Sequence, residues 1–254
     1  MKVIKHYFDW ADPASQRIFQ NETGSFEIEE RFHIQADNLI RNFALDRGGL
    51  FLDYGCGVGK HAICLKKKGC NVMGYDMSAY YIRKAKEFTA HEGVQLAFHH
   101  STDFFTSFYG RFDFIYTIAF PFTYLDEGSI VSLFSAIKAL LAEKGQFLFG
   151  FPYTRENREH FLPRNRWEEK NGLLYLTDEK MDEGGRRTER YMIIDMENDS
   201  AEEWVDETTY YYLPEIHEFL KRGGFTITGE FENLKKKAPD SPIDVYFLLC
   251  EPSL

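Results

Sequence analysis

Three glycines at alternate positions follow an aspartate in the segment LFLDYGCGVGKHAICL, which begins at position 50. The glycines are Gly55, Gly57 and Gly59, and the aspartate is Asp53. Because glycine raises the entropy cost of ordering a chain, such a run indicates that something must approach the backbone closely. The apolar runs on either side predict a strand before the glycines and a helix after them. In a strand-to-helix turn, free backbone N–H groups and the helix dipole favour an anionic ligand.

A second acid, Asp76, ends the next predicted strand, at position 76 of the chain. In doubly wound sheets, ligands bind beyond the carboxyl ends of the strands, and an acid at this place can accept both hydroxyls of a ribose. The dinucleotide-binding pattern GxGxxG requires a third glycine at position 60, where this sequence has Lys60. The register disfavours a nicotinamide-dependent oxidoreductase, which stays open as an alternative function.

Strands and helices are expected to alternate through the first part of the chain. Helices are predicted over 28–43, 59–68, 78–90 and 127–142. Strands are predicted over 50–54, 71–76, 94–99, 112–120 and 146–151. This alternation predicts an α/β fold with a parallel sheet covered by helices on both faces.

A β-rich insertion is expected to interrupt the alternation after Pro152. The segment 153–208 shows no amphipathic helix, but it contains a hairpin that turns at Gly184-Gly185 and a third strand near 203–212. A helix from Pro214 and two strands, FTITGEF and DVYFLLC, follow it. We therefore expect one domain made of residues 1–152 and 213–254, with 153–212 as an insertion that covers an acceptor site or contacts another subunit.

The composition excludes several classes of function. A net charge of −10 over 254 residues argues against a nucleic-acid partner, because proteins that neutralise many phosphates present basic surfaces. No run of 18 apolar residues predicts a membrane span, and the first ten residues lack the apolar core of a signal peptide. The four cysteines form no CxxC pair, and the histidines lack metal-ligand spacing. We expect a cytoplasmic protein with reduced thiols and no metal.

These motifs jointly resemble those of the class I S-adenosylmethionine-dependent methyltransferases. The family's first motif resembles LFLDYGCGVG, its second strand VMGYDMS, its adenine-contacting stretch STDFF, and its fourth strand FDFIYTIAF. The resemblance covers roughly residues 28–151 and resumes at 213–250. It implies a seven-stranded, doubly wound, Rossmann-like sheet, mostly parallel with an antiparallel last strand, plus a small antiparallel β insertion. It also implies S-adenosyl-L-methionine as the cofactor.

The resemblance further implies a role for each residue of the glycine-rich motif and of the fourth strand. Asp53 would orient the cationic methionine end of the cofactor, partly through the glycine loop. Close approach through the backbone is implied for Gly55, Cys56, Gly57, Gly59, Ile118 and Ala119.

The remaining cofactor contacts are implied at the ends of the second and third strands. Asp76 would accept the ribose hydroxyls, and Met77 would pack on the adenine. Asp103 would accept a hydrogen bond from the adenine amino group, with Phe104 beside it. Two alternatives stay open, because Met77 could belong to the core and Asp103 could cap the turn after the third strand.

The β-rich insertion resembles that of small-molecule methyltransferases, including glycine and aminosugar N-methyltransferases. It implies a small-molecule acceptor, with an amine or a hydroxyl as the methylated group, and it could pair two subunits into a homodimer. The segment AFPFTYL lacks the (N/D/S)PP(Y/F) motif of DNA amino-methyltransferases, which also argues against a DNA acceptor. A protein that binds the cofactor without catalysis is a further alternative.

Two residues are candidates for contact with the reacting groups. Tyr124 follows the fourth strand, where it could orient an acceptor amine as a catalytic residue or merely pack between this strand and the next helix. His61 follows the glycine loop at the start of a helix, where it could belong to the cofactor site or lie on the helix surface.

Overall fold

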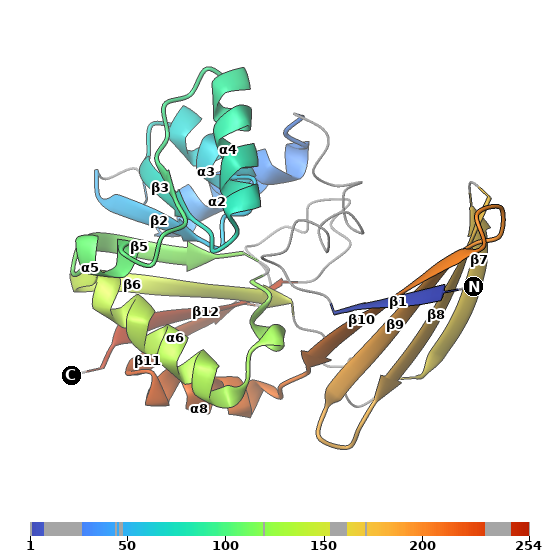
Figure 1. Cartoon of the computed structure of the whole chain (residues 1–254). Helices are drawn as coiled ribbons and strands as arrows, with labels where there is room; N and C mark the ends of the chain where they lie inside the picture. The colour runs from blue at the N-terminus through green and yellow to red at the C-terminus, as the bar shows by residue number, and fades with distance from the viewer. Residues whose placement is uncertain are drawn as a thin grey trace.

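The computed structural model of the protein contains two β-sheets (Figure 1). The larger sheet has seven strands in the order β11-β12-β6-β5-β2-β3-β4, and the smaller sheet has five in the order β1-β10-β9-β8-β7. The structure describes residues 2–7, 27–43, 45, 48–118, 120–152, 162–170, 172–231 and 245–253.

The larger sheet is parallel except for its last strand. Its members are β2 (Leu50–Tyr54), β3 (Asn71–Tyr75), β4 (Phe98–His99), β5 (Phe112–Thr117), β6 (Leu141–Pro152), β11 (Phe225–Phe231) and β12 (Val245–Pro252). The strand β12 runs antiparallel to both of its neighbours, whereas the pairs among β4, β3, β2, β5 and β6 are parallel. The predicted mostly parallel, seven-stranded sheet is therefore confirmed.

Helices cover both faces of this sheet. They are α2 (Glu30–Phe43), α3 (Lys60–Lys67), α4 (Ala79–His91), α5 (Phe104–Ser107), α6 (Glu127–Leu140) and α8 (Leu213–Arg222). Successive residues of a strand point to opposite faces, so Phe51 packs with α2, α3 and α4, and Leu52 packs with α6 and α8. Figure 1 shows the first group above the sheet and the second group below it. This is the doubly wound arrangement that the alternation predicted.

Side-chain caps begin two of these helices. The Ser78 hydroxyl accepts a hydrogen bond from the Tyr81 N–H at 3.3 Å, as the sequence predicted for the start of α4. The Asp126 carboxylate accepts one from the Ser129 N–H at 2.8 Å at the start of α6. Each cap satisfies a backbone donor that the helix itself leaves free. The first cap begins the helix that directly follows Asp76.

The smaller sheet contains the expected insertion and one further strand. Its members are β1 (Lys2–Tyr7), β7 (Arg164–Lys170), β8 (Leu173–Met181), β9 (Arg186–Asp195) and β10 (Ser200–Thr209). The predicted hairpin is confirmed as β8 and β9, whose turn is held by a hydrogen bond from the Arg186 N–H to Asp182 Oδ1 at 2.9 Å. Gly185 adopts a φ of 84°, which suits glycine.

The N-terminal strand corrects the expected domain boundaries. Residues 2–7 were grouped with the larger unit, but β1 pairs in parallel with β10, from Lys2 opposite Ser200 to Tyr7 opposite Val205. Nothing local signals this pairing, because its two strands lie almost 200 residues apart in the sequence. Two other bounds also shift: the strand expected over 94–99 is shorter, at Phe98–His99, and the strand expected over 203–212 lies at Ser200–Thr209.

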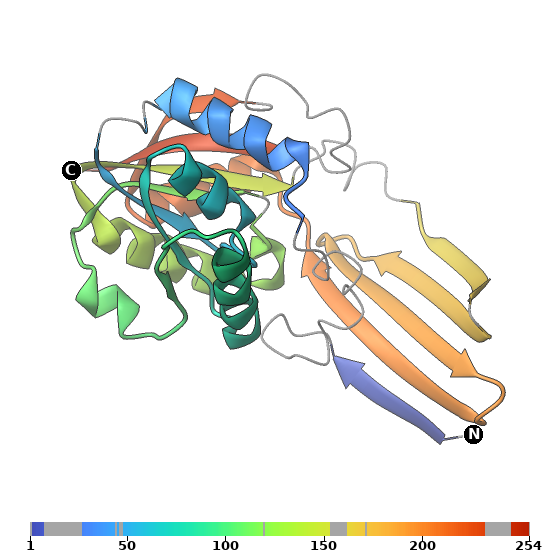
Figure 2. The same cartoon turned by 90° about the horizontal axis from the view of Figure 1, so that it is seen from above.

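The smaller sheet lies beyond the carboxyl ends of the parallel strands. In Figure 1 it stands on the side toward which β5 and β6 point, and Figure 2 shows the same separation from above. Ligands of doubly wound sheets bind at this end. Among the described residues, no helix combines the length and apolarity needed to cross a membrane.

Candidate cofactor and acceptor site

The glycine-rich loop leaves the carboxyl end of β2 in a left-handed conformation. The φ angles of Gly55, Gly57 and Gly59 are 76°, 53° and 79°, in a region that residues with a side chain rarely adopt. The N–H groups of Gly55 and Cys56 donate to the Tyr75 carbonyl at 2.8 and 3.0 Å. The loop is thereby tied to the end of the neighbouring strand β3.

Neighbouring atoms distinguish the three glycines. A Cβ atom on Gly55 would lie 2.8 Å from the Phe120 ring, and one on Gly59 would lie 2.5 Å from the Phe98 ring. A Cβ atom on Gly57 would meet no atom of the described residues within 4 Å. Gly55 and Gly59 are therefore required by packing within the protein, whereas Gly57 faces open space where a ligand can reach the backbone.

Asp76 connects this loop to the start of α4. It is 9% exposed, and its Oδ2 and Oδ1 accept hydrogen bonds from the N–H groups of Gly57 and Ser78, both at 2.9 Å. Burial raises the pKa of the carboxyl, and the two backbone bonds act in the opposite direction. A carboxylate has about four lone-pair sites, so Asp76 keeps capacity for ribose hydroxyls. Met77 beside it is 68% exposed, which rules out the core interpretation of this side chain.

Asp53 is a buried carboxylate with an unsatisfied oxygen. It is 3% exposed, and its Oδ2 has no hydrogen-bond partner among the described residues. Burial raises the pKa of Asp53 to about 7; the nearby Tyr116 hydroxyl, on the paired strand β5, counteracts this, and the charge of Asp76 adds to it. An unpaired buried carboxylate is costly, so this site fits the cationic end of the cofactor.

We expect the affinity for S-adenosylhomocysteine to depend on pH through Asp53. In the free protein, a carboxyl with a pKa of about 7 is mostly protonated at pH 6. A cationic ligand group favours the carboxylate, so binding releases a proton, and affinity rises roughly tenfold between about pH 6 and pH 8. Calorimetry across this range, in buffers of different ionisation enthalpy, measures both quantities. Asp53→Asn is the control that should lose the pH dependence, and an equal slope in both proteins would exclude Asp53 as its source.

Asp103 and Phe104, both expected near the adenine, differ in their exposure to solvent. Asp103 is exposed and its side chain forms no capping hydrogen bond, so the capping alternative has no support and the carboxylate is accessible. Phe104 is 3% exposed, and its ring lies 4.8 Å from that of Tyr75 in an aromatic cluster. Its N–H already donates to the Ser101 carbonyl at 3.1 Å. Phe104 is thus a core residue whose backbone donor is in use.

His61 packs against helix α2. Its Nε2 lies 2.8 Å from Gln35 Oε1, and its ring centroid lies 4.7 Å from that of Phe32. Burial, together with the charges of Arg31 and Lys60, lowers the pKa of His61 to about 3. The imidazole is therefore neutral at physiological pH, and its contacts favour a packing role for this residue.

Three further residues, Ile118, Cys56 and Ala119, were expected to contact the cofactor through their backbone atoms. Ile118 is partly buried and packs with the residues beneath α2, α3 and α4. Cys56 is partly buried, and burial raises the pKa of its thiol well above the ordinary value, so it is not a reactive thiolate. Ala119 lies outside the described residues.

The segment after β5 joins the glycine loop to the smaller sheet. The Phe120 ring packs against Gly55 and lies 5.7 Å from the Tyr54 ring, a contact that sequence reasoning missed. The short helix η2 (Phe122–Tyr124) follows, and the Tyr124 side chain interacts with the Asp206 carboxylate of β10.

The end of η2 is also connected to the segment that follows β10, through Tyr211. The Tyr211 hydroxyl, just beyond β10, donates to the Leu125 carbonyl at 2.9 Å, and its ring stacks on Phe122 at 5.8 Å. Tyr124 therefore does more than fill space between β5 and α6, because it contacts an acid of the other sheet.

Comparison with known proteins identifies a domain within the larger sheet and its helices. Residues 51–145 match a family model described as a methyltransferase domain. This match, together with the strand order and the glycine loop, indicates a methyltransferase domain in the larger sheet. No curated protein sequence matches the chain significantly.

Solved structures of low sequence identity share the fold over nearly the whole chain. An S-adenosylmethionine-dependent methyltransferase from Clostridium acetobutylicum is 14% identical, with a TM-score of 0.67 and coverage of 95% of this chain and 97% of that one. The CcbJ methyltransferase from Streptomyces caelestis is 15% identical, with a TM-score of 0.69 and coverage of 94% and 96%. CalS10 from Micromonospora echinaspora, solved with S-adenosylmethionine bound, is described as an amino pentose methyltransferase of calicheamicin biosynthesis. It is 17% identical, with a TM-score of 0.59 and coverage of 96% and 99%.

Proposed function

We propose that the protein methylates an amine nitrogen of a small molecule, and that the smaller sheet covers the acceptor. The observation that carries this proposal is the contact between Tyr124 and Asp206, which brings a buried acid of the smaller sheet to the segment that follows β5. A buried acid suits a cationic acceptor better than a neutral one. The fold shared with CalS10, which is described as acting on an amino sugar, is consistent with this acceptor class.

In this proposal the cofactor is S-adenosyl-L-methionine, and the residues of the larger sheet bind and orient it. Asp76 accepts the ribose hydroxyls, Gly57 admits the ligand to the backbone, and the Asp53 carboxylate faces the cationic methionine end. We assign the adenine contacts to Met77 and Asp103, and the exposure of both side chains supports this assignment. The residues of this chain thus fit the group that the fold implies.

The chemistry needs little acid–base help from the protein. When bound, S-adenosylmethionine would supply a methyl group already activated by its sulfonium. The acceptor nitrogen must first lose a proton to solvent. Its lone pair can then form the carbon–nitrogen bond as the carbon–sulfur bond breaks, giving a methylated ammonium and S-adenosylhomocysteine. The chain contributes in-line positioning and exclusion of water, which can supply most of the rate. Tyr124 holds the acceptor by its hydroxyl or its ring, since a phenol with an ordinary pKa of about 10 is a poor base at neutral pH.

The test of this function has a binding step and a turnover step. S-adenosylhomocysteine at about 100 times its dissociation constant should stabilise the fold by roughly 2.7 kcal/mol, on the order of 5–10 °C in melting temperature, and NAD should not. Formation of S-adenosylhomocysteine is then measured with small amines and with their hydroxyl counterparts. Turnover with amines supports the proposal, and turnover with hydroxyl compounds alone would replace it with O-methylation. Binding without turnover on any acceptor would favour a cofactor-binding protein.

A further inference from the structure

Three acids lie side by side across the smaller sheet. Glu179 of β8 is directly opposite Glu189 of β9, and Glu189 is directly opposite Asp206 of β10. Their exposed fractions are 9%, 4% and 7%, so all three are buried. Like charges directly opposite one another destabilise a sheet, and burial increases that cost. A row of this kind needs compensating positive charge.

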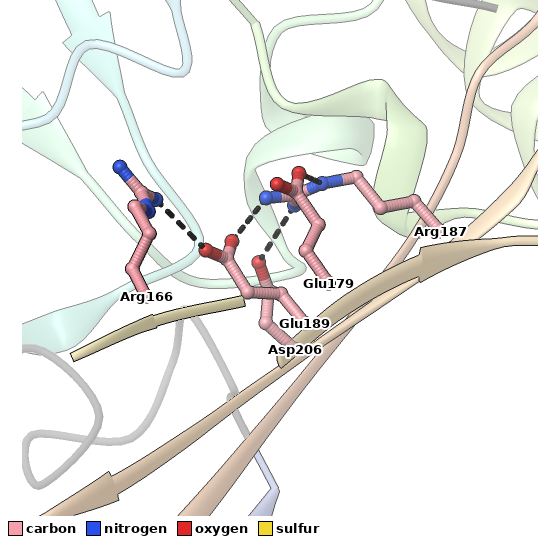
Figure 3. A network of polar contacts seen from close by, with 5 residues as sticks. All are labelled: Arg166, Glu179, Arg187, Glu189 and Asp206. Carbon is pink, nitrogen blue, oxygen red and sulfur yellow. Dashed lines mark hydrogen bonds and ion pairs between the residues drawn. The ribbon is translucent and has the colours of Figure 1, made fainter. Parts of the chain in front are cut away.

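Arg187 supplies part of that charge. It lies two residues from Glu189 on the same strand, so both side chains point to one face of the sheet. Its Nε lies 2.5 Å from Glu179 Oε1, its Nη1 lies 3.7 Å from Asp206 Oδ2, and its Nη2 contacts Glu189 (Figure 3). Burial alone would lower the pKa of Arg187, but the Glu179 and Glu189 carboxylates raise it above the ordinary value, so the guanidinium stays charged.

The negative charge still exceeds the positive charge. The other guanidinium in Figure 3, that of Arg166 on β7, is 3.9 Å from Glu189 Oε1, and its side chain is 61% exposed. An exposed arginine at this distance offsets little, because solvent screens it. Among the described residues, three buried carboxylates thus share one buried guanidinium, which leaves negative charge in excess at this place.

Asp206 is where this excess is open to a ligand. Its Oδ1 is buried and has no hydrogen-bond partner among the described residues, whereas its Oδ2 faces Arg187. Burial raises the pKa of Asp206, although Tyr124 and Arg187 both act in the opposite direction. Within the described part of the chain, no group of His, Cys, Asp and Glu side chains has an arrangement that could hold a metal ion. An organic cation therefore suits this place better than a metal.

We propose that Asp206 Oδ1 and the hydroxyl of Tyr124, whose side chain interacts with the same carboxyl group, bind the ammonium group of the methyl acceptor. This inference rests on the proposed function and specifies the acceptor as a cation with N–H donors. An ammonium group offers three donors and one positive charge, so it satisfies the free oxygen and offsets the excess charge together. One of its protons must leave to solvent before the nitrogen lone pair can attack the methyl group. A hydroxyl group would supply a donor but no charge. Arg187 is a positioning residue, because its guanidinium contacts all three carboxylates.

The first experiment uses methylammonium chloride as the probe, since it carries the proposed group and nothing else. Melting temperatures are measured with S-adenosylhomocysteine present, in methylammonium chloride and in sodium chloride of equal ionic strength. At several times its dissociation constant, methylammonium should raise the wild-type melting temperature by roughly 2–4 °C over sodium. Asp206→Asn should abolish this difference, and Tyr124→Phe should reduce it. A wild-type protein that responds equally to the two salts overturns the subsite.

Glu207→Gln is the matched control. Glu207 is the next residue on β10, its side chain is 41% exposed, and it pairs with Arg186 at 3.0 Å on the other face of the sheet. This variant should keep the full methylammonium effect. Loss of the effect in both variants would mean that the salts act on the general charge of the protein, which also overturns the proposal.

The melting temperature of Asp206→Asn without any amine separates a ligand site from a structural ion pair. Removing one of three crowded carboxylates should leave the melting temperature at or above the wild-type value. A fall of several degrees would mean that Asp206 mainly stabilises the fold through its ion pair with Arg187, and that result overturns the proposal.

Kinetics distinguish failure of this subsite from failure of the proposed function. With any amine that wild-type protein methylates, Asp206→Asn should raise the acceptor KM at least tenfold and leave the dissociation constant of S-adenosylhomocysteine unchanged. An unchanged KM in a variant that still turns over rejects the subsite but leaves amine methylation intact. Methylation of hydroxyl compounds alone by the wild-type protein would reject both.

Discussion

Asp76→Ala is expected to weaken S-adenosylhomocysteine binding by roughly 2–4 kcal/mol, a loss of about 30-fold to 1000-fold. The carboxylate would accept hydrogen bonds from the ribose, and it also holds the Gly57 and Ser78 N–H groups, each at 2.9 Å. Alanine removes both sets of bonds, so the ligand and the loop lose their shared acceptor. The fold should survive, because the residue follows the end of β3. Isothermal calorimetry measures the affinity, and thermal unfolding checks the fold.

Two matched variants resolve the contributions to this loss. Asp76→Asn keeps one oxygen acceptor near the loop, so it should bind more tightly than Asp76→Ala while remaining weaker than wild type. Ser78→Ala removes the cap of α4, which typically costs about 1 kcal/mol of stability, and should leave the affinity close to wild type. If Asp76→Ala bound S-adenosylhomocysteine with unchanged affinity, the ribose role would be rejected.

Gly59→Ala should mainly lower the stability of the fold, whereas Gly57→Ala should mainly weaken ligand binding, although the two glycines share one loop. At position 59 a methyl group would lie 2.5 Å from the buried Phe98 ring, and the backbone φ is 79°. The left-handed conformation costs roughly 1–2 kcal/mol and overpacking roughly 1–3 kcal/mol, so the free energy of unfolding should fall by about 2–5 kcal/mol. Chemical denaturation measures this loss.

Gly57→Ala should act on the ligand instead. In the described part of the chain no atom lies within 4 Å of its added Cβ, so the expected cost to the fold is that of the left-handed conformation, roughly 1–2 kcal/mol. The methyl group would occupy the space through which a ligand reaches the backbone, so the affinity for S-adenosylhomocysteine should drop at least about tenfold, or 1.4 kcal/mol. Equal destabilisation by the two variants, or tight binding by Gly57→Ala, would contradict this division of roles.

The larger sheet could be predicted from the sequence because its signals are local. Each strand is a short apolar run, each helix shows its own periodicity, and Ser78 marks a helix start by its chemistry alone. The Asp53 to Gly59 loop and Asp76 were found for the same reason, since a strand-to-helix turn with an acid after the next strand is a pattern within about 25 residues. These features were sufficient to predict a cofactor site at the carboxyl ends of the parallel strands.

Contacts between distant segments escaped this reasoning. The ring of Phe120 against Gly55, the packing of His61 on α2 and the burial of Phe104 each depend on side chains from different elements. A sequence pattern states that a residue is aromatic or titratable, but not which neighbour covers it. His61 illustrates the consequence, because burial, which no local pattern reveals, lowers its pKa to about 3.

The sequence by itself determined the α/β core, the glycine loop and the acids that end β2 and β3. Only the tertiary structure decided how the smaller sheet is completed and which of its acids matter. The pairing of β1 with β10 and the alignment of Glu179, Glu189 and Asp206 arise from register across strands. In the sequence these acids are three among 40, and most surface carboxylates are only solvated. Strand pairing and burial turn them into a charged cluster in which Asp206 Oδ1 has no partner among the described residues. Both are properties of contacts between segments that lie apart in the chain.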